Sequence, residues 1–199
     1  KTAGVHVDLS QGRILDDGYG DGGAVTGIEN IGGSLFGPGN DILIGDAGDN
    51  VITGYYGDDR LEGRGGADTL NGGDGDDVLV GGEGADTLSG GAGADEYRFN
   101  TLDELDGDTI TDLEGVDRIE LTGIDAGELL LSFIGEADFS GVAGQVRYVK
   151  DEDSTRVEID SDGDGVADQT LTIEGLADLK RDSGDGFTLV TLTRIEGTE

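Results

Sequence analysis

The chain has 199 residues, with 45 Asp or Glu against 12 Lys or Arg, so its formal net charge is −33. A charge of this sign repels nucleic-acid phosphates and anionic lipids, and it favours cations as partners. Without a cysteine, neither a disulfide nor a thiolate metal site can stabilise the chain. No apolar run is long enough to span a bilayer, so we predict no membrane span.

The first segment, residues 1–35, has no regular repeat. Val5, Val7 and Leu9 alternate with other residues as on a half-buried strand, and we expect irregular coils that lead into the rest of the fold. The chain begins at Lys1 without a signal peptide, which indicates a piece of a longer protein. His6 is the single histidine, and there is neither an H-E-x-x-H motif nor a nucleophile elbow. We interpret His6 as a surface residue and predict no catalytic site.

Residues 36–98 repeat every nine residues. The seven nonapeptides are FGPGNDILI (36–44), GDAGDNVIT (45–53), GYYGDDRLE (54–62), GRGGADTLN (63–71), GGDGDDVLV (72–80), GGEGADTLS (81–89) and GGAGADEYR (90–98). Position 4 is always Gly, position 6 is Asp or once Asn, and position 8 is Leu, Ile or Tyr. Acidic chains with few aromatic residues can be disordered, but acidic and apolar residues at fixed positions are typical of a repeat architecture.

Each nonapeptide is predicted to form a turn and a short strand. Glycines at positions 1, 2 and 4 permit positive φ and leave backbone carbonyls unshielded. Positions 7 to 9 then place one apolar side chain inward between two outward ones. Two nonapeptides would make one coil of eighteen residues, with repeat n stacked on repeat n+2 at roughly 4.8 Å. The predicted fold is all-β, a right-handed parallel β-roll (β-solenoid) with a C-terminal β cap.

The stacked acids pose an electrostatic problem. Two carboxylates about 5 Å apart repel by about 3 kcal/mol at an effective dielectric constant near 20. One buried Leu per repeat contributes about 2 kcal/mol, which does not offset both this repulsion and the entropy of ordering nine residues. We therefore expect a bridging cation. Carboxylate and carbonyl oxygens without imidazole or thiolate suit Ca²⁺, whereas Mg²⁺ demands a tighter octahedron.

The repeats resemble the signature of the RTX (repeats-in-toxin) family, G-G-x-G-x-D-x-U-x with U large and apolar. The flanks TGIENIGGS (26–34) and DTITDLEGVDRIEL (108–121) are similar to those of the C-terminal domain of serralysin-type secreted metalloproteases and related type I-secreted proteins. The resemblance implies a calcium-binding parallel β-roll that holds about five to eight Ca²⁺ ions between its turns.

The resemblance also implies ligands. Each ion would take the carbonyls of positions 2 and 4 and the Asp of one turn, with the carbonyls of positions 1 and 3 and the Asp of the next turn on the same side. The implied pairs are Asp41 with Asp59, Asn50 with Asp68, Asp59 with Asp77, Asp68 with Asp86, and Asp77 with Asp95. Glu29 would close a site against the turn that holds Asn50, and Asp108, together with Asp103, would close one after the last repeats.

The implied set in the roll is Glu29, Gly37, Gly39, Asp41, Gly45, Asp46, Gly48, Asn50, Gly54, Tyr55, Tyr56, Gly57, Asp59, Gly63, Arg64, Gly65, Gly66, Asp68, Gly72, Gly73, Asp74, Gly75, Asp77, Gly81, Gly82, Glu83, Gly84, Asp86, Gly90, Ala92, Asp95, Asp103 and Asp108. Asp46, Tyr55 and Arg64 stand where the signature has its second Gly, so we expect the second to fourth turns to be distorted. Phe36 departs from the signature at its first Gly.

Beyond residue 98 the nine-residue period ends. Strands are predicted at 117–121, 128–134, 145–150, 155–160, 169–174 and 186–193, so the expected division is entry coils (1–35), roll (36–98) and a β-rich cap (99–199). In DSDGDGVADQ (160–169), Asp160, Asp162, Asp164 and Asp168 fall at positions 1, 3, 5 and 9 of an EF-hand-like calcium loop. Leu171 stands where the bidentate Glu belongs, so the alternative is a plain acidic hairpin turn.

Two functions remain open from the sequence. The RTX resemblance implies a module of a larger extracellular protein from a Gram-negative bacterium, exported by a type I secretion system and folded outside the cell by Ca²⁺. The alternative is a polysaccharide-binding or adhesive module, for which Arg60, Arg64 and Arg98 are the few basic candidates in the repeats.

Overall fold

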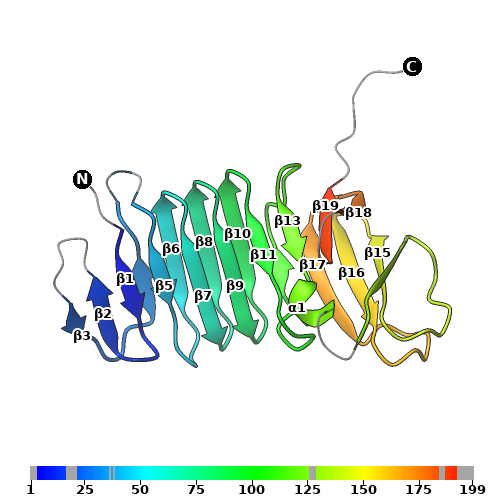
Figure 1. The fold of residues 1–199 in the computed structure, drawn as a ribbon, viewed down its shortest axis with the longest axis horizontal. Helices are drawn as coiled ribbons and strands as arrows, with labels where there is room; N and C mark the ends of the chain where they lie inside the picture. Colours follow the sequence, from blue (N-terminus) through cyan, green and yellow to red (C-terminus); the bar gives the residue numbers. More distant parts are fainter. Residues whose placement is uncertain are drawn as a thin grey trace, which may run out of the picture.

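The computed structural model describes residues 4–16, 22–35, 37, 39–125, 129–183 and 187–191. Within these ranges the regular secondary structure is β-strand, apart from one short helix, α1 (Thr122–Asp125). The strands stack along the long axis of an elongated body (Figure 1). No helix in the described part is long and apolar enough to cross a membrane.

Two sheets run along the molecule, and each combines roll strands with C-terminal strands. Sheet A has the order β18 (Leu179–Arg181), β19 (Thr188–Thr191), β13 (Arg118–Glu120), β11 (Glu96–Arg98), β9 (Val78–Glu83), β7 (Arg60–Gly65), β5 (Ile42–Ile44), β1 (His6–Asp8), β2 (Arg13–Asp16), β3 (Gly23–Ala24). Sheet B has the order β14 (Ser132–Gly135), β15 (Gln145–Lys150), β16 (Ser154–Asp160), β17 (Gln169–Glu174), β12 (Thr109–Ile110), β10 (Thr87–Ala92), β8 (Thr69–Asp74), β6 (Val51–Tyr56), β4 (Asn30–Gly32).

The repeats alternate between the two sheets, and neighbouring strands are parallel. Leu43 pairs with Leu61, and Leu61 with Leu79, in sheet A. Ile52 pairs with Leu70 in sheet B. Each step is eighteen residues, so two nonapeptides make one coil, as their turn-plus-strand pattern predicts. The all-β parallel β-roll is confirmed.

The core of the roll is a single file of position-8 side chains between the two sheets. Their exposed fraction is 0% in every repeat: Leu43, Ile52, Leu61, Leu70, Leu79, Leu88 and Tyr97. Ile110 and Ile119 continue the file after steps of 22 residues, since Leu88 pairs with Ile110 and Tyr97 with Ile119. The roll therefore continues for one more coil after the last nonapeptide.

The segment before the repeats closes the other end. Strand β1 pairs in parallel with β5, and β2 and β3 add to it as antiparallel strands. Leu9 is buried, while Val5 and Val7 are partly buried against the core, which agrees with the alternation in the sequence. His6 lies on β1 and is partly exposed.

The C-terminal strands extend both sheets. Strand β12 pairs in parallel with β17, with Thr109 opposite Thr172, and β13 pairs antiparallel with β19. Three of the predicted strands appear as β15, β16 and β17, and the region 117–121 holds β13. The predictions for 128–134 and 186–193 reach partly outside the described residues, which hold β14 and β19 there. Strands β12 and β18 were not predicted.

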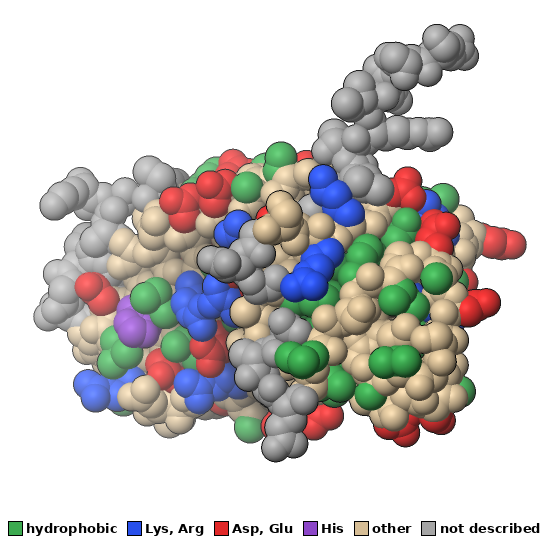
Figure 2. All heavy atoms as spheres, turned by 45° about the vertical axis from the view of Figure 1, so that its right-hand side comes forward, with side chains coloured by type: hydrophobic (Ala, Val, Ile, Leu, Met, Phe, Trp, Pro, Cys, Tyr) green, Lys and Arg blue, Asp and Glu red, His purple; other side chains and the backbone are tan. Residues whose placement is uncertain are grey.

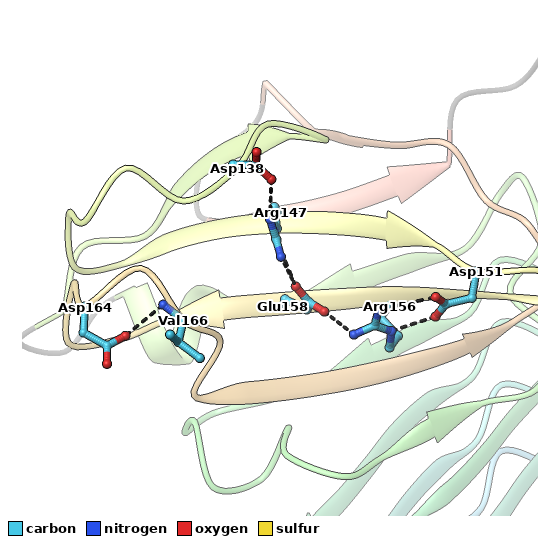
Figure 3. Close-up of polar contacts among 7 residues, drawn as sticks. All are labelled: Asp138, Arg147, Asp151, Arg156, Glu158, Asp164 and Val166. Carbon is cyan, nitrogen blue, oxygen red and sulfur yellow. Dashed lines mark hydrogen bonds and ion pairs between the residues drawn. The ribbon is translucent and has the colours of Figure 1, made fainter.

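A chain of ion pairs stabilises the antiparallel pair β15 and β16 (Figure 3). Arg147 lies between Asp138 (3.1 Å) and Glu158 (Nε to Oε2 2.9 Å). Arg156 also contacts Glu158 and donates to Asp151 at 2.7 Å. Glu158, which is buried, thus pairs with both guanidinium groups.

Candidate metal sites

Two rows of position-6 side chains follow the stacked turns of the roll. The first row contains Asp41, Asp59, Asp77, Asp95 and Asp117, and the second contains Asn50, Asp68, Asp86 and Asp108. All of these side chains are at most 2% exposed. Like charges are therefore stacked out of contact with water, an arrangement that is costly unless each carboxylate finds a partner.

One oxygen of the carboxylate finds a backbone partner in the preceding coil. Oδ1 of Asp59 accepts the N–H of Asp41 at 2.7 Å, and Oδ1 of Asp68 accepts that of Asn50 at 2.7 Å. The same bond recurs along both rows. The second oxygen, Oδ2, is buried without a hydrogen-bond partner among the described residues at Asp59, Asp68, Asp77, Asp86, Asp95 and Asp108. Six buried carboxylate oxygens at equivalent places in successive coils are the arrangement that we expect of cation ligands.

Burial raises the pKa of these carboxyl groups. It brings the pKa of Asp59 and Asp95 to about 7, because desolvation outweighs the backbone N–H bonds and the neighbouring acids add to it. The same causes raise the pKa of Asp108 to about 8. The pKa values of Asp68 and Asp77 rise to about 6. At neutral pH each row thus needs positive charge, from protons or from a metal ion.

Position-1 glycines lie close against five of the six unpartnered oxygens, all but that of Asp108. A Cβ added to Gly54 would lie 2.2 Å from Oδ2 of Asp59 and 2.6 Å from the carbonyl oxygen of Gly72. Gly63 stands in the same relation to Asp68, at 2.2 Å. The space is lined by carboxylate and carbonyl oxygens, which are the ligands that Ca²⁺ prefers. The residues present therefore fit calcium.

The third and fourth turns keep the geometry of the glycine turns despite their larger residues. Tyr55 and Arg64 adopt φ values of 78° and 82°, in the region that Gly73 and Gly82 occupy one coil later. They also stay in register with those glycines. The expected distortion is absent there, and the backbone strain is borne by two side-chain-bearing residues. The second turn does differ, because neither residue 46 nor residue 48 has positive φ.

Of the flanking residues, Glu29 and Asp108 lie at the two ends of the second row. The N–H of Val51 donates to the carbonyl of Glu29 at 2.8 Å, just as that of Arg60 donates to Asp41 at 2.9 Å. Glu29 is thus the position-6 equivalent in the coil before Asn50. Asp108 is fully buried, and its Oδ1 accepts the N–H of Asp86 at 2.8 Å.

Asp103 is exposed on the loop after β11, apart from this row. The sequence prediction also missed Asp117. Its Oδ1 accepts the N–H of Asp95 at 3.0 Å, and its Oδ2 accepts that of Glu114 at 2.7 Å. A signal for it was present, since Asp108 and Asp117 are nine residues apart and each precedes a buried Ile by two residues.

The acidic loop between β16 and β17 brings together three of its four predicted ligands. Carboxylate oxygens of Asp160, Asp162 and Asp168 lie within 4.8 Å of one another. Asp160 is buried and accepts the N–H groups of Gly163 (2.7 Å) and Gly165 (3.0 Å). Asp164 instead accepts the N–H of Val166 at 2.8 Å (Figure 3).

One family model agrees with this geometry. The family model described as the RTX calcium-binding nonapeptide repeat (4 copies) matches residues 37–70 and 62–97. No curated protein matches the chain. Among solved structures, the solution structure of the R3 subunit of a mannuronan C5-epimerase from Azotobacter vinelandii is 28% identical, covers 76% of this chain and 78% of that chain, and has a TM-score of 0.33. The roll between residues 37 and 97 is built of RTX calcium-binding nonapeptide repeats.

Proposed function

We propose that the chain is a calcium-dependent folding module of a larger secreted protein. The observation that carries the proposal is the set of six buried Oδ2 atoms that have no partner among the described residues. Ions that bind only the folded state stabilise it, and several sites multiply the effect. About five to eight Ca²⁺ ions would fill the roll and its flanks.

The coupling of Ca²⁺ binding to folding would also decide where the chain folds. Where Ca²⁺ is scarce, as in a bacterial cytosol, the rows of buried acids would keep the chain unfolded and fit for threading through a type I exporter. At extracellular Ca²⁺ concentrations the ions would fold it after export. The flanks similar to serralysin-type proteins favour such a parent protein, and the module itself would stabilise that protein without catalysing a reaction.

The test is far-UV circular dichroism of the calcium-free chain at about pH 8, above the raised pKa values of the buried acids, titrated with Ca²⁺ and, as the matched control, with Mg²⁺. We expect the strand signal to appear cooperatively with Ca²⁺ only. Persistence of the full strand signal in excess chelator would end the proposal. A fold that appears equally well with Mg²⁺ would refute the choice of metal.

We propose the 160–168 loop as a further calcium site, supported by the close approach of Asp160, Asp162 and Asp168. The variant Asp162→Asn should bind one ion fewer than the parent chain by native mass spectrometry. The control Asp153→Asn, in the neighbouring hairpin turn, should bind the same number. Equal numbers of bound ions in the parent chain and both variants would show that the loop is an acidic turn without its own ion.

A second candidate function, binding of an acidic polysaccharide, is favoured by one feature of sheet A. All four basic residues between positions 39 and 120 line two adjoining grooves there, of about 360 and 460 Å³: Arg60, Arg64, Arg98 and Arg118. Figure 2 shows basic side chains in blue near the single histidine.

In each groove two arginines share one acid. Arg60 and Arg64 lie 3.3 and 3.4 Å from Glu62, and Arg118 lies 2.9 Å from Glu96, which also pairs with Arg98. A guanidinium has five N–H donors, which is more than these ion pairs use, so each arginine could also donate to a carboxylate of a ligand. Calorimetry in saturating Ca²⁺ should detect alginate oligomers but not cello-oligosaccharides.

The variant Arg118→Gln should weaken that binding, whereas Lys150→Gln, on sheet B, should not. Absence of heat with alginate at millimolar concentrations would exclude this second function and leave the calcium-dependent module untouched.

A further inference from the structure

The last nonapeptide has a polar group in the core file. Tyr97 stands at position 8, where the other six nonapeptides have Leu or Ile, and its side chain is fully buried. A buried hydroxyl is costly unless it forms hydrogen bonds. The Tyr97 hydroxyl donates to Oδ1 of Asp112 at 2.8 Å and accepts the N–H of Gly90 at 2.9 Å. The tyrosine thus connects the last repeat to an acid that lies beyond the repeats.

The strand ladder of sheet B is interrupted at this place. In the earlier coils the position-2 residues pair with one another, Tyr55 with Gly73 and Gly73 with Gly91. Strand β12, the next neighbour of β10, pairs with it over two residues only. Gly91 is therefore left without a strand partner in the following coil, as far as the described residues extend.

The carboxylate of Asp112 takes the place of the missing strand. Its Oδ1 accepts the Tyr97 hydroxyl and, at 3.1 Å, the N–H of Gly90. Its Oδ2 accepts the N–H of Gly91 at 3.0 Å and the hydroxyl of Ser89 at 2.7 Å. Each carboxylate oxygen thus has two donors, and all four donors belong to the last two repeats.

The peptide unit between Gly90 and Gly91 connects this carboxylate with the first row of acids. A trans peptide is planar, so its C=O points away from its N–H. The carbonyl oxygen of Gly90 lies 2.6 Å from a Cβ built on Gly72, and Oδ2 of Asp77 lies 2.2 Å from the same point. Because glycines flank this peptide on both sides, its backbone alone does not fix its orientation. The bond from the Gly91 N–H to Asp112 does.

We propose that Asp112 and Tyr97 are positioning residues for the calcium site between Asp77 and Asp95. They hold the N–H of Gly91, and thereby direct the Gly90 carbonyl toward the ion, without contacting the ion themselves. This inference rests on the proposed calcium-dependent function, and it assigns a role to two side chains that the repeat signature does not specify.

The test uses two variants of the full chain at about pH 8, above the raised pKa values of the buried acids. Tyr97→Phe removes the hydroxyl and keeps the ring and the net charge. Asp112→Asn keeps the shape of the side chain and replaces one accepting oxygen by a donor. The matched controls are Tyr148→Phe, at a tyrosine of β15 that is 7% exposed, and Asp106→Asn, at an exposed acid that accepts the N–H of Thr170 at 2.9 Å.

Three measurements separate a positioning role from a general structural one. Native mass spectrometry counts the bound Ca²⁺ ions, and calorimetry gives their affinities. Hydrogen exchange in saturating Ca²⁺, followed by mass spectrometry, reports on the peptides that contain Gly90 and Gly91. A residue that merely stabilises the fold would change all ion affinities and all exchange rates together, whereas a positioning residue changes one ion and one turn.

We expect both variants to weaken one ion by about 10-fold to 100-fold, as loss of a group that orients a metal ligand typically does. Exchange should become faster in the turn at Gly90 and Gly91 only. The double variant should lose little more affinity than the more affected single variant, because both side chains act on the same peptide. Both controls should bind Ca²⁺ as the parent chain does.

Unchanged affinities in both variants would overturn the inference, and so would a uniform weakening of all ions or an equal loss in the controls. These results would leave the proposed function intact, because the parent chain would still bind its ions. A parent chain that binds no Ca²⁺ would refute the proposed function and this inference with it, so the two failures are distinguishable.

Discussion

The raised pKa values of the buried acids predict how the calcium-free chain responds to pH. A carboxyl group whose pKa is higher in the folded state favours folding while it is protonated, and this contribution is lost as the pH rises through the folded-state pKa. For this roll the stabilisation is fully present below the unfolded value of 3.8 and is lost between about pH 4 and pH 8, since the folded-state values reach about 6 for Asp68 and Asp77 and about 8 for Asp108.

The expected magnitude is large compared with the stability of a domain. One pKa unit corresponds to about 1.4 kcal/mol, so a rise from 3.8 to about 7 at Asp59 corresponds to roughly 4 kcal/mol. Two such groups amount to about 8 kcal/mol, which is within the 5–15 kcal/mol that typically separates folded from unfolded domains. The calcium-free chain should therefore hold strand structure near pH 4.5 and lose it near pH 8.

The assay is urea unfolding followed by far-UV circular dichroism at pH 4.5, 6, 7 and 8, with dialysed calcium-free protein. The same series in millimolar Ca²⁺ is the control and should vary much less with pH above 6, because the ion takes the place of the protons. Equal stability of the calcium-free chain at pH 4.5 and pH 8 would refute the reasoning, since the buried carboxylates would then carry no net cost.

Three substitutions test the roll itself. Leu79→Ala, in the middle of the core file and fully buried, should reduce the free energy of unfolding in Ca²⁺ by about 3 kcal/mol in urea titrations; a loss below 1 kcal/mol would contradict the packing. Gly72→Ala would place a Cβ 2.2 Å from Oδ2 of Asp77, so calorimetry should show a weakened site, whereas Gly23→Ala, with open space around its Cβ, should bind normally. Arg64→Gly should relieve a positive φ of 82° and raise the thermal midpoint by a few degrees, equivalent to about 1 kcal/mol; a lower midpoint would show that the side chain contributes more than the strain costs.

The nine-residue period of the sequence was sufficient to predict the coil of the roll. Its elements are local: glycines permit the turn, one apolar side chain fills the core, and the Asp follows the turn directly. Because these positions recur at a fixed spacing, stacking every eighteen residues is the one register that aligns Leu43 with Leu61 and Asp41 with Asp59. The carboxylate rows, and with them the calcium chemistry, follow from that register.

Only the tertiary structure revealed how the rows continue where the period is interrupted. Loops of irregular length separate Asp95 from Asp117 and Glu29 from Asn50, so equivalence there is decided by long-range backbone hydrogen bonds and not by spacing. The junction of β12 with the C-terminal strand β17 depends in the same way on Thr109 pairing with Thr172, 63 residues later. The gathering of the arginines on one sheet is a property of the coil as well. Strand β7 crosses the boundary between two nonapeptides, so it holds both Arg60 and Arg64 in the sheet that also contains β11 and β13.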